Sequence, residues 1–318
     1  MGPLGSVSKH LKSVIRRCKL GESDFALVEG ERLVTSVAKL SQSPPSYLLS
    51  TCPHLLARLR DRCRAGHRGQ IGDCVLVTDR LMSQLADAAT PQACLAVFPK
   101  PDPTKAAEIR QRRLDAVTSG GLRLDYSVLC WRVSDPANVG GIARLSWCLG
   151  ARRLLMTPGS ANPWLPKAIR AGAGAHFDLP IVSNCAEFSD ASQLLSAFSR
   201  ILVACSARPK DSLLLTGSRE LADTLRQDAG SSICLLLGSE ANGLPDELMK
   251  SLNEAAPERV TMLHVPMSDY RQTASLNVAA AAGIVLHRLY SLADGGDLLD
   301  SAADAAADRL SSAGGRYR

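Results

Sequence analysis

The sequence feature that most constrains the fold is a short, continuously apolar run that ends in a glycine turn. Residues 233–237 read Ile-Cys-Leu-Leu-Leu, and Gly238 and Gly243 bracket the turn that follows. A run of this kind suits a strand buried on both faces, as in a parallel sheet. Glycine in the turn permits positive φ and lets a ligand approach the main chain closely. The run therefore predicts a central strand of an α/β sheet with a site at its carboxyl end.

Two later segments carry similar signals. Residues 260–267 form a short apolar stretch interrupted by Pro266, which stops a strand because it lacks a backbone donor. Ser275 is a suitable N-cap for an apolar helix over 276–289. Two strand ends and one helix start could therefore meet at one edge of the sheet, where open α/β sheets bind ligands. Two ordinary strand-to-helix turns are the alternative.

Strand and helix patterns alternate along most of the chain, which predicts two α/β layers. The second layer, over 126–292, has the pattern of a mostly parallel sheet covered on both faces. Residues 99–125 are rich in proline, glycine and basic residues, and we expect a linker with a short helix in its middle. The organisation that we predict is a tag remnant at 1–6, a small α/β domain at 7–98, the linker at 99–125, the larger domain at 126–292 and a disordered tail at 293–318.

Charge and cysteine usage narrow the class of protein. The net charge is +6, and the basic residues cluster, which fits a polyanionic partner. The ten cysteines are spread singly without a Cys-x-x-Cys pair, so we expect no metal site and a reducing compartment. No stretch approaches the ~20 apolar residues of a membrane span. The densest basic cluster contains Arg58, Arg60, Arg62, Arg64 and Arg68, for which a solvated helix face is the alternative to phosphate contacts.

The three segments, together with residues 138–144, resemble the motifs of the TrmH/SpoU branch of the SPOUT RNA methyltransferases. Residues 138–144 read Asn-Val-Gly-Gly-Ile-Ala-Arg, and the resemblance covers about residues 126–292. Residues 164–167 (Trp-Leu-Pro-Lys) and 170–177 are similar to the members that act on mitochondrial large-subunit rRNA. The resemblance implies methyl transfer from S-adenosylmethionine to a ribose 2′-hydroxyl without a metal. It also implies a trefoil knot at the C-terminal end of the sheet, a homodimer, and a ribosomal-protein-like substrate-binding domain at the N-terminus.

The resemblance also assigns candidate catalytic residues. Arg144 would act near the target phosphate and hydroxyl; because arginine stays protonated, we expect it to orient the phosphate and to stabilise alkoxide charge rather than to act as a base. A plain surface arginine is the alternative. Asn138 would hold the loop or the ribose, or else cap its helix. Glu240 is expected to structure the site by pairing with Arg144, and Asn277 to bond the substrate or the opposing loop.

Main-chain groups would bind the methyl donor, as the resemblance implies. The matching positions are Gly238, Val265 and Leu276, with Met267 and Ala279 as neighbours. Backbone recognition agrees with the absence of a Gly-x-Gly-x-x-Gly motif, which excludes a typical nicotinamide oxidoreductase. One departure is the long loop after Pro266, where Asp269 replaces the glycine that many members have.

These features predict a function in RNA modification. We expect 2′-O-methylation of large-subunit rRNA, with guanosine favoured, by a homodimer that binds RNA and not membranes. A mitochondrial location, in the matrix, is favoured over the cytoplasm. The alternative is a catalytically inactive RNA-binding ribosome assembly factor that keeps the SPOUT fold, which the altered loop would favour.

Overall fold

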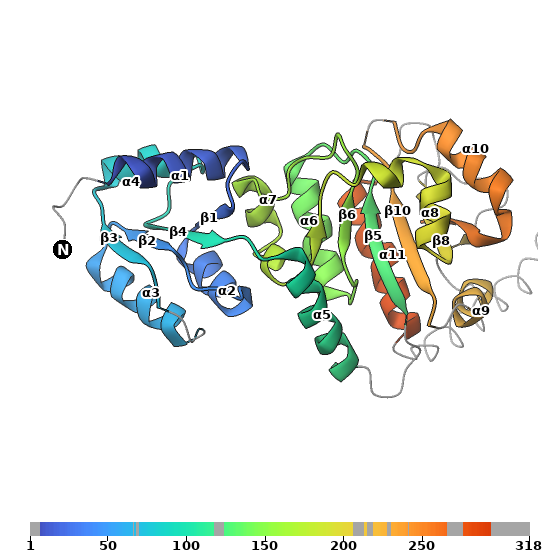
Figure 1. Cartoon of the computed structure of the whole chain (residues 1–318), viewed down its shortest axis with the longest axis horizontal. Helices are drawn as coiled ribbons and strands as arrows, with labels where there is room; N and C mark the ends of the chain where they lie inside the picture. The colour runs from blue at the N-terminus through green and yellow to red at the C-terminus, as the bar shows by residue number, and fades with distance from the viewer. Residues whose placement is uncertain are drawn as a thin grey trace, which may run out of the picture.

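The computed structural model describes residues 7–65, 67, 70–117, 124–205, 213–214, 219–227, 230–240, 242–265 and 276–293. These residues form two sheets that lie side by side, each between helices (Figure 1). The predicted tag remnant, Arg68, Met267, Ser275 and the tail from residue 294 lie outside the described residues. Within the described residues, no helix has the length and apolar character needed to cross a bilayer.

The N-terminal layer is a four-stranded sheet in the order β1-β4-β2-β3. Its strands are β1 (Phe25–Glu29), β2 (Tyr47–Ser50), β3 (Asp73–Leu76) and β4 (Cys94–Pro99). Strand β4 is antiparallel to both neighbours, whereas β2 and β3 are parallel. One face packs against α1 (Lys9–Leu20) and α4 (Asp79–Leu85), and the other against α2 (Glu31–Leu40) and α3 (Pro53–Ala65). The predicted alternation of strand and helix is therefore present in this layer.

The larger layer is a seven-stranded sheet in the order β7-β6-β5-β10-β8-β11-β9, and every pairing in it is parallel. This confirms the predicted α/β class with a mostly parallel sheet. The strands are β5 (Asp125–Cys130), β6 (Leu154–Met156), β7 (Ile181–Val182), β8 (Arg200–Cys205), β9 (Leu213–Leu214), β10 (Ser232–Leu237) and β11 (Val260–His264). The predicted knot stays a prediction, because the connection from β11 to the last helix lies outside the described residues.

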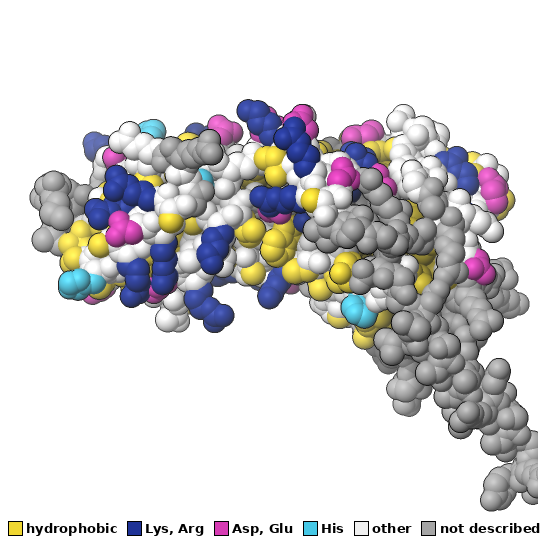
Figure 2. All heavy atoms as spheres, turned by 90° about the horizontal axis from the view of Figure 1, so that it is seen from below, with side chains coloured by type: hydrophobic (Ala, Val, Ile, Leu, Met, Phe, Trp, Pro, Cys, Tyr) yellow, Lys and Arg dark blue, Asp and Glu magenta, His cyan; other side chains and the backbone are white. Residues whose placement is uncertain are grey.

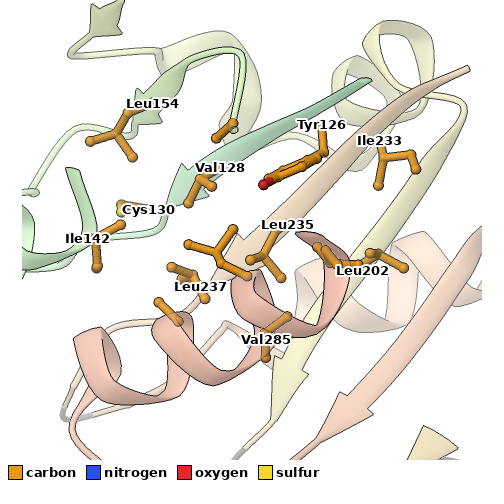
Figure 3. Packing of buried hydrophobic residues seen from close by; sticks show 14 of the residues in the cluster. Tyr126, Val128, Cys130, Ile142, Leu154, Leu202, Ile233, Leu235, Leu237 and Val285 are labelled. Carbon is orange, nitrogen blue, oxygen red and sulfur yellow. The ribbon is translucent and has the colours of Figure 1, made fainter. Parts of the chain in front are cut away.

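Both faces of this sheet are covered, as its continuously apolar strands require. One face packs against α6 (Pro136–Cys148), α9 (Arg219–Gln227) and α11 (Val278–Ala293). The other packs against α8 (Ala191–Ala197) and α10 (Asp246–Ala255). In Figure 3, Leu235 and Leu237 of β10 lie between β5 and the side chain of Val285 from α11. The predicted strand over 233–237 thus lies at the centre of the core.

Two short helical elements follow one another after β7. A 3-10 turn, η2 (Ala186–Ser189), precedes α8, and Asp190 separates them. The Asp190 carboxylate accepts a hydrogen bond from the Ser192 amide at 2.7 Å and so caps α8. A residue that caps one helix has a non-helical backbone, which is why the pattern does not continue through it.

The two layers share one hydrophobic cluster. Helix α7 (Pro166–Ala171) and the 3-10 turn η1 (Ala175–Phe177) follow β6, yet they pack against the N-terminal sheet. Phe177 contacts Phe98 of β4 edge to face, with ring centroids 5.7 Å apart. Trp164 adds a second such contact to Phe177, also at 5.7 Å. The N-terminal layer is therefore held against the larger layer by buried aromatic packing.

The predicted linker contains a helix of four turns rather than a short one. Helix α5 (Pro103–Val117) has 15 residues, and its Arg110 is almost fully buried. The Arg110 guanidinium donates to the carbonyl of Trp147 at 2.7 Å and lies 3.8 Å from a carboxylate oxygen of Asp178. The buried face of α5 is held largely by charge and hydrogen bonds, so its apolar periodicity understates its length.

Candidate active site

The candidate site lies where β5 and β10 adjoin. The two strands end level with each other, since Cys130 pairs with Leu237. From β5 the sheet continues through β6 and β7 on one side, and from β10 through β8 and β11 on the other. This is the topological switch point of the sheet, where the connections leave in opposite directions and open a crevice for ligands. The loops after β5 and β10 therefore define the position of the site.

The glycine turn after β10 closes upon itself. Ser239 and Gly243 exchange two backbone hydrogen bonds of 3.1 and 3.0 Å. Gly243 has φ +65°, and a Cβ atom on Gly238 would come within 2.6 Å of the Gly243 carbonyl carbon. Both glycines are thus required, one by its backbone conformation and one by close approach of the chain.

Glu240, in this turn, holds the loop that follows β5. Its carboxylate accepts hydrogen bonds from Asn138 Nδ2 at 2.8 Å and from the amides of Ser134 and Asp135 at 3.2 and 3.4 Å. Burial raises the pKa of Glu240, but these donors together lower the pKa by more than burial raises it. The pKa of Glu240 is therefore below its ordinary value. The expected pairing with Arg144 is wrong: among the described residues, the partners of Glu240 are Asn138 and the β5 loop. A neutral amide and two backbone donors satisfy the carboxylate without a cation.

Asn277 joins the last helix to the same network. Its Nδ2 donates to Asn138 Oδ1 at 2.9 Å, while its Oδ1 accepts from the amides of Ala279 and Ala280 at 2.9 and 3.3 Å. Asn277 is therefore the cap of α11, which begins at Val278 and not at Leu276 as predicted, while Ser275, the predicted cap, lies outside the described residues. Asparagine and serine cap equally well, so sequence alone could not choose between them.

Helix α6 is capped by Asp135, not by Asn138. The Asp135 side chain accepts from the Ala137 amide at 3.0 Å, and Pro136 occupies the first helical position. Lys167 of α7 lies 2.8 Å from the same carboxylate, and this hydrogen bond is the main reason that the pKa of Asp135 is lowered. The Asp-Pro pair was a readable capping signal that the sequence reasoning did not use. Asn138 is thereby left to link Glu240 and Asn277.

Arg144 lies apart from this network. It is exposed on α6, six residues beyond Asn138, and the two side chains are therefore about 120° apart around the helix axis. No hydrogen bond or ion pair joins Arg144 to another of the described residues. Its guanidinium is consequently available to a ligand, whereas Asn138, Glu240 and Asn277 are engaged with one another.

The positions expected to bind the methyl donor converge only in part. Strands β10 and β11 are both paired to β8, with Leu237 and Leu263 opposite Ala204, so Gly238 and Val265 follow strand ends roughly 10 Å apart. Leu276 precedes Asn277 and is 38% exposed. Ala279 packs towards α6, where a Cβ on Gly141 would lie 3.2 Å from its methyl group. That contact gives Ala279 a role in helix packing.

The arginine cluster of α3 is divided between two sides of the helix. Arg58 and Arg62 form ion pairs of 2.8 and 3.0 Å with Glu31 of α2. Arg60 and Arg64 are on the other side, near Cys74 of β3. Figure 2, seen from the lower side of Figure 1, shows Lys and Arg side chains spread over this N-terminal half. The cluster is therefore exposed, but part of its charge is balanced by Glu31.

Comparison with known proteins identifies the class to which this fold and site belong. The model of the SpoU rRNA Methylase family matches residues 125–287, which is more than half of the chain. The chain therefore belongs to the SpoU rRNA methylase family and is an RNA methyltransferase by class. This confirms the resemblance deduced from residues 138–144 and from the glycine turn.

Individual relatives extend beyond the family region. The chain is 27% identical to rRNA methyltransferase 3, mitochondrial, of Mus musculus, over 89% of this chain and 70% of the relative. It is 24% identical to the 23S rRNA (guanosine(2553)-2′-O)-methyltransferase RlmP of Bacillus subtilis, over 83% of this chain and 87% of the relative. A similar fold occurs in the AdoMet-bound rRNA methyltransferase of Sinorhizobium meliloti, with TM-score 0.63, 20% identity, and 90% and 95% of the two chains covered. Both layers therefore have counterparts in related chains.

Proposed function

We propose that this protein transfers a methyl group from S-adenosylmethionine to a ribose 2′-hydroxyl of large-subunit rRNA. The SpoU family match supports the class of reaction, and the named activities of the mouse and Bacillus relatives support an rRNA substrate. Guanosine is the proposed target nucleoside, in line with the name of the Bacillus relative. The mitochondrial matrix is the proposed location, in line with the name of the mouse relative.

The observation that carries the proposal is the hydrogen-bonded chain from Glu240 through Asn138 to Asn277. It links the β10 turn and the start of α11 to the start of α6, which is more than 100 residues from each of them in sequence. Such a network fixes three loop ends at the switch point, and it does not engage the charge of Arg144, which is exposed on α6. A rigid scaffold on the same helix as an available cation suits the positioning of a phosphate ester for reaction.

The residues at the turn fit the proposed methyl donor. Gly238, Val265 and Leu276 would hold it through main-chain groups, with Gly238 at the start of the closed turn after β10. When bound, S-adenosylmethionine supplies a methyl group already activated on a sulfonium. The protein then has to orient the ribose and to help its hydroxyl lose a proton.

Arg144 and Glu240 have different roles in this proposal. The lowered pKa of Glu240 and its three hydrogen bonds make it a weak base, so we assign it to holding the β5 loop. Arg144 would bind the phosphate next to the target ribose and stabilise the negative charge that develops on the 2′-oxygen. The proton would leave to water.

Replacement of Arg144 tests the proposal directly. Arg144→Ala should reduce methyl transfer to rRNA by at least about 100-fold, on the scale of losing a charge-stabilising donor, without changing the melting temperature. Arg144→Lys should recover part of the rate. The assay is incorporation of labelled methyl from S-adenosylmethionine, followed by mapping of ribose methylation at nucleotide resolution. An unchanged rate in Arg144→Ala would remove Arg144 from the reaction, and methylation of another nucleoside would overturn guanosine.

A homodimer is part of the proposal. Three of the exposed large apolar side chains among the described residues, Leu276, Ile284 and Tyr290, lie on or just before α11. A second copy that covers α11 would remove them from water. Ile284→Glu should shift sedimentation from dimer to monomer, and a wild-type monomer at all concentrations would contradict the proposal.

An inactive assembly factor is the second candidate, favoured only by the long loop that contains Asp269. Titration calorimetry with S-adenosylmethionine separates the two functions. Heat of binding with a 1:1 stoichiometry supports the enzyme. Binding of RNA without any binding of S-adenosylmethionine supports the assembly factor.

A further inference from the structure

The most one-sided charged surface in the described structure is on α1, not on α3. Helix α1 carries Lys9, Lys12, Arg16, Arg17 and Lys19 and no acidic residue. Lys9, Lys12 and Arg16 are exposed at i, i+3 and i+7, so they follow one face of the helix. No ion pair links any of these three to another described residue. Their charges are therefore unbalanced locally, in contrast to Arg58 and Arg62 of α3, which share Glu31.

Helix α4 widens this cationic face into a groove. A surface cavity of about 280 Å³ lies between the two helices. It is lined by Lys12, Arg16 and Lys19 of α1 together with Leu81, Gln84 and Leu85 of α4. Lys19 donates to the carbonyl of Ala86 at 2.6 Å, just after the last turn of α4, and so fixes α1 against α4. Asp79, at the start of α4, is the acidic residue of that helix, and it is not among the groove residues.

The two helices that form the groove lie on the side of the molecule where the candidate site is. In Figure 1, α1 and α4 lie along the upper side of the N-terminal layer, and β5 points upward, so its carboxyl end is on this side too. Helix α3 lies along the lower side. A direct contact agrees with this view: Asn162, in the loop after β6, donates to the carbonyl of Gly21 at the end of α1, at 3.1 Å.

Further cations lie between α1 and the site. Arg132 follows β5 directly, with φ +50°, and its side chain lies beside Gly159 in the loop after β6. Lys167 of α7 adjoins Asp135 at the start of α6. Both residues are on loops or helix starts at the carboxyl edge of the sheet. Exposed basic groups are thus present both on α1 and at the carboxyl edge of the larger sheet, as a polyanion that crosses both layers would need.

We propose that the groove between α1 and α4 is the surface through which the N-terminal layer binds the phosphate backbone of RNA. This inference rests on the proposed RNA methyltransferase function and names the part of the N-terminal layer that holds the substrate. Flexible lysine and arginine side chains on a helix face bind phosphates without reading bases, so the contact would fix the register of the RNA relative to the site. Arg58 and Arg62 of α3 would then serve mainly to fix α3 to α2.

Matched charge reversals on the two helices test this inference. The α1 variant is Lys12→Glu with Arg16→Glu, and the α3 variant is Arg60→Glu with Arg64→Glu, which breaks no ion pair to Glu31. Affinity for a fluorescein-labelled RNA hairpin is measured by anisotropy over a series of KCl concentrations. The α1 variant should bind at least about tenfold more weakly at low salt and lose about two units of the slope of log K against log salt. The α3 variant should change both quantities much less.

The outcomes separate this inference from the proposed function. Weaker binding by the α3 variant alone, or an equal loss in both variants, would overturn the α1 groove while leaving the methyltransferase in place. A wild-type protein that binds neither the hairpin nor S-adenosylmethionine would instead contradict the proposed function. Circular dichroism checks that each variant is folded, and Lys12→Gln with Arg16→Gln replaces the α1 variant if reversal of charge disturbs the helix.

Discussion

The two ends of α6 carry polar networks of similar composition but opposite exposure. At the N-terminal end, Glu240 and Asn138 form a hydrogen bond in contact with solvent. At the C-terminal end, the side chains of Arg110 and Asp178 are only 7% and 6% exposed. Both arrangements suit the helix dipole, with carboxylates at the start of the helix and a guanidinium at its last carbonyls. The electrostatic principle is shared, so burial is what distinguishes the two ends.

Burial decides which end contributes to stability and which to function. A charge that is removed from water depends on its partners, and loss of one partner leaves the other uncompensated. The same pair in contact with water contributes little to stability, since water replaces each lost contact. We therefore expect substitutions at the Arg110 end to unfold the protein, and substitutions at the Glu240 end to leave it folded but inactive.

The largest effect is expected for Arg110→Ala. This change removes a buried guanidinium that lies 3.8 Å from Asp178 and donates to the carbonyls of Trp147 and Ala151. Asp178 keeps a hydrogen bond from the Trp147 indole, but the two carbonyls lose their buried donor, so the free energy of unfolding should fall by about 3 kcal/mol. Arg113→Ala is the matched control: Arg113 pairs with the same carboxylate but is 53% exposed, and its loss should cost under about 1 kcal/mol. Urea unfolding followed by circular dichroism measures both. Equal losses in the two variants would show that burial is not the deciding factor.

A pH-dependent effect that also arises from burial of an ionisable side chain is expected at His176. This residue is fully buried near α6, and burial lowers its pKa from 6.5 to about 4. Because the unfolded chain takes up the proton first, the stability associated with neutral His176 is complete above pH 6.5. It is lost as the pH falls towards 4, by about 3 kcal/mol.

The measurement compares wild type with His176→Leu, which cannot titrate. Free energies of unfolding are measured at pH 7, 6, 5 and 4. The value for wild type minus the value for His176→Leu should decrease steadily below pH 6.5. A constant difference would mean that His176 is not held neutral in the folded state.

The two glycines of α6 allow a further comparison of a tightly packed and a loosely packed position on this helix, without any change of charge. A Cβ on Gly140 would lie 2.1 Å from the carbonyl oxygen of Ala168 in α7, so Gly140→Ala should destabilise the protein by about 1–3 kcal/mol. A Cβ on Gly141 would lie 3.2 Å from the methyl group of Ala279, and the helix preference of alanine offsets that crowding. Gly141→Ala should therefore be nearly neutral in thermal unfolding. A larger loss from Gly141→Ala than from Gly140→Ala would reverse the assignment of tight and loose faces.

Local patterns were sufficient to predict β10, β11 and the class of fold, because apolar runs and glycine turns are short-range signals. The partner of Glu240 could not be predicted, since Asn138 is 102 residues away and Arg144 carries the more obvious charge. The length of α5 was underestimated for a different reason: an ion pair to Asp178 buries Arg110, and a charged residue is not an apolar signal. Position in space, not composition, divides the arginines of α3 and favours α1 as the RNA-binding face.

The smallest effect on stability is expected for Glu240→Gln, at the exposed end of α6. Glutamine keeps one oxygen acceptor, but its NH2 group then faces either the Ser134 amide, or both the Asp135 amide and Asn138 Nδ2. At least one hydrogen bond at this site is therefore lost. Because these contacts are open to water, the free energy of unfolding should change by less than about 1 kcal/mol. Methyl transfer should nevertheless fall by about tenfold or more, since Asn138 is no longer held by a carboxylate.

The lowered pKa of Glu240 gives a second way to recognise the effect of this substitution. The stabilising contribution of ionised Glu240 is present above the ordinary pKa of a glutamate, and it is lost as the pH falls through the lower pKa of the folded state. The glutamine variant should lack this acid-dependent loss of stability. If Glu240→Gln instead destabilises the protein as much as Arg110→Ala, the network at the site is a structural element, and the two ends of α6 do not differ in the way that their burial indicates.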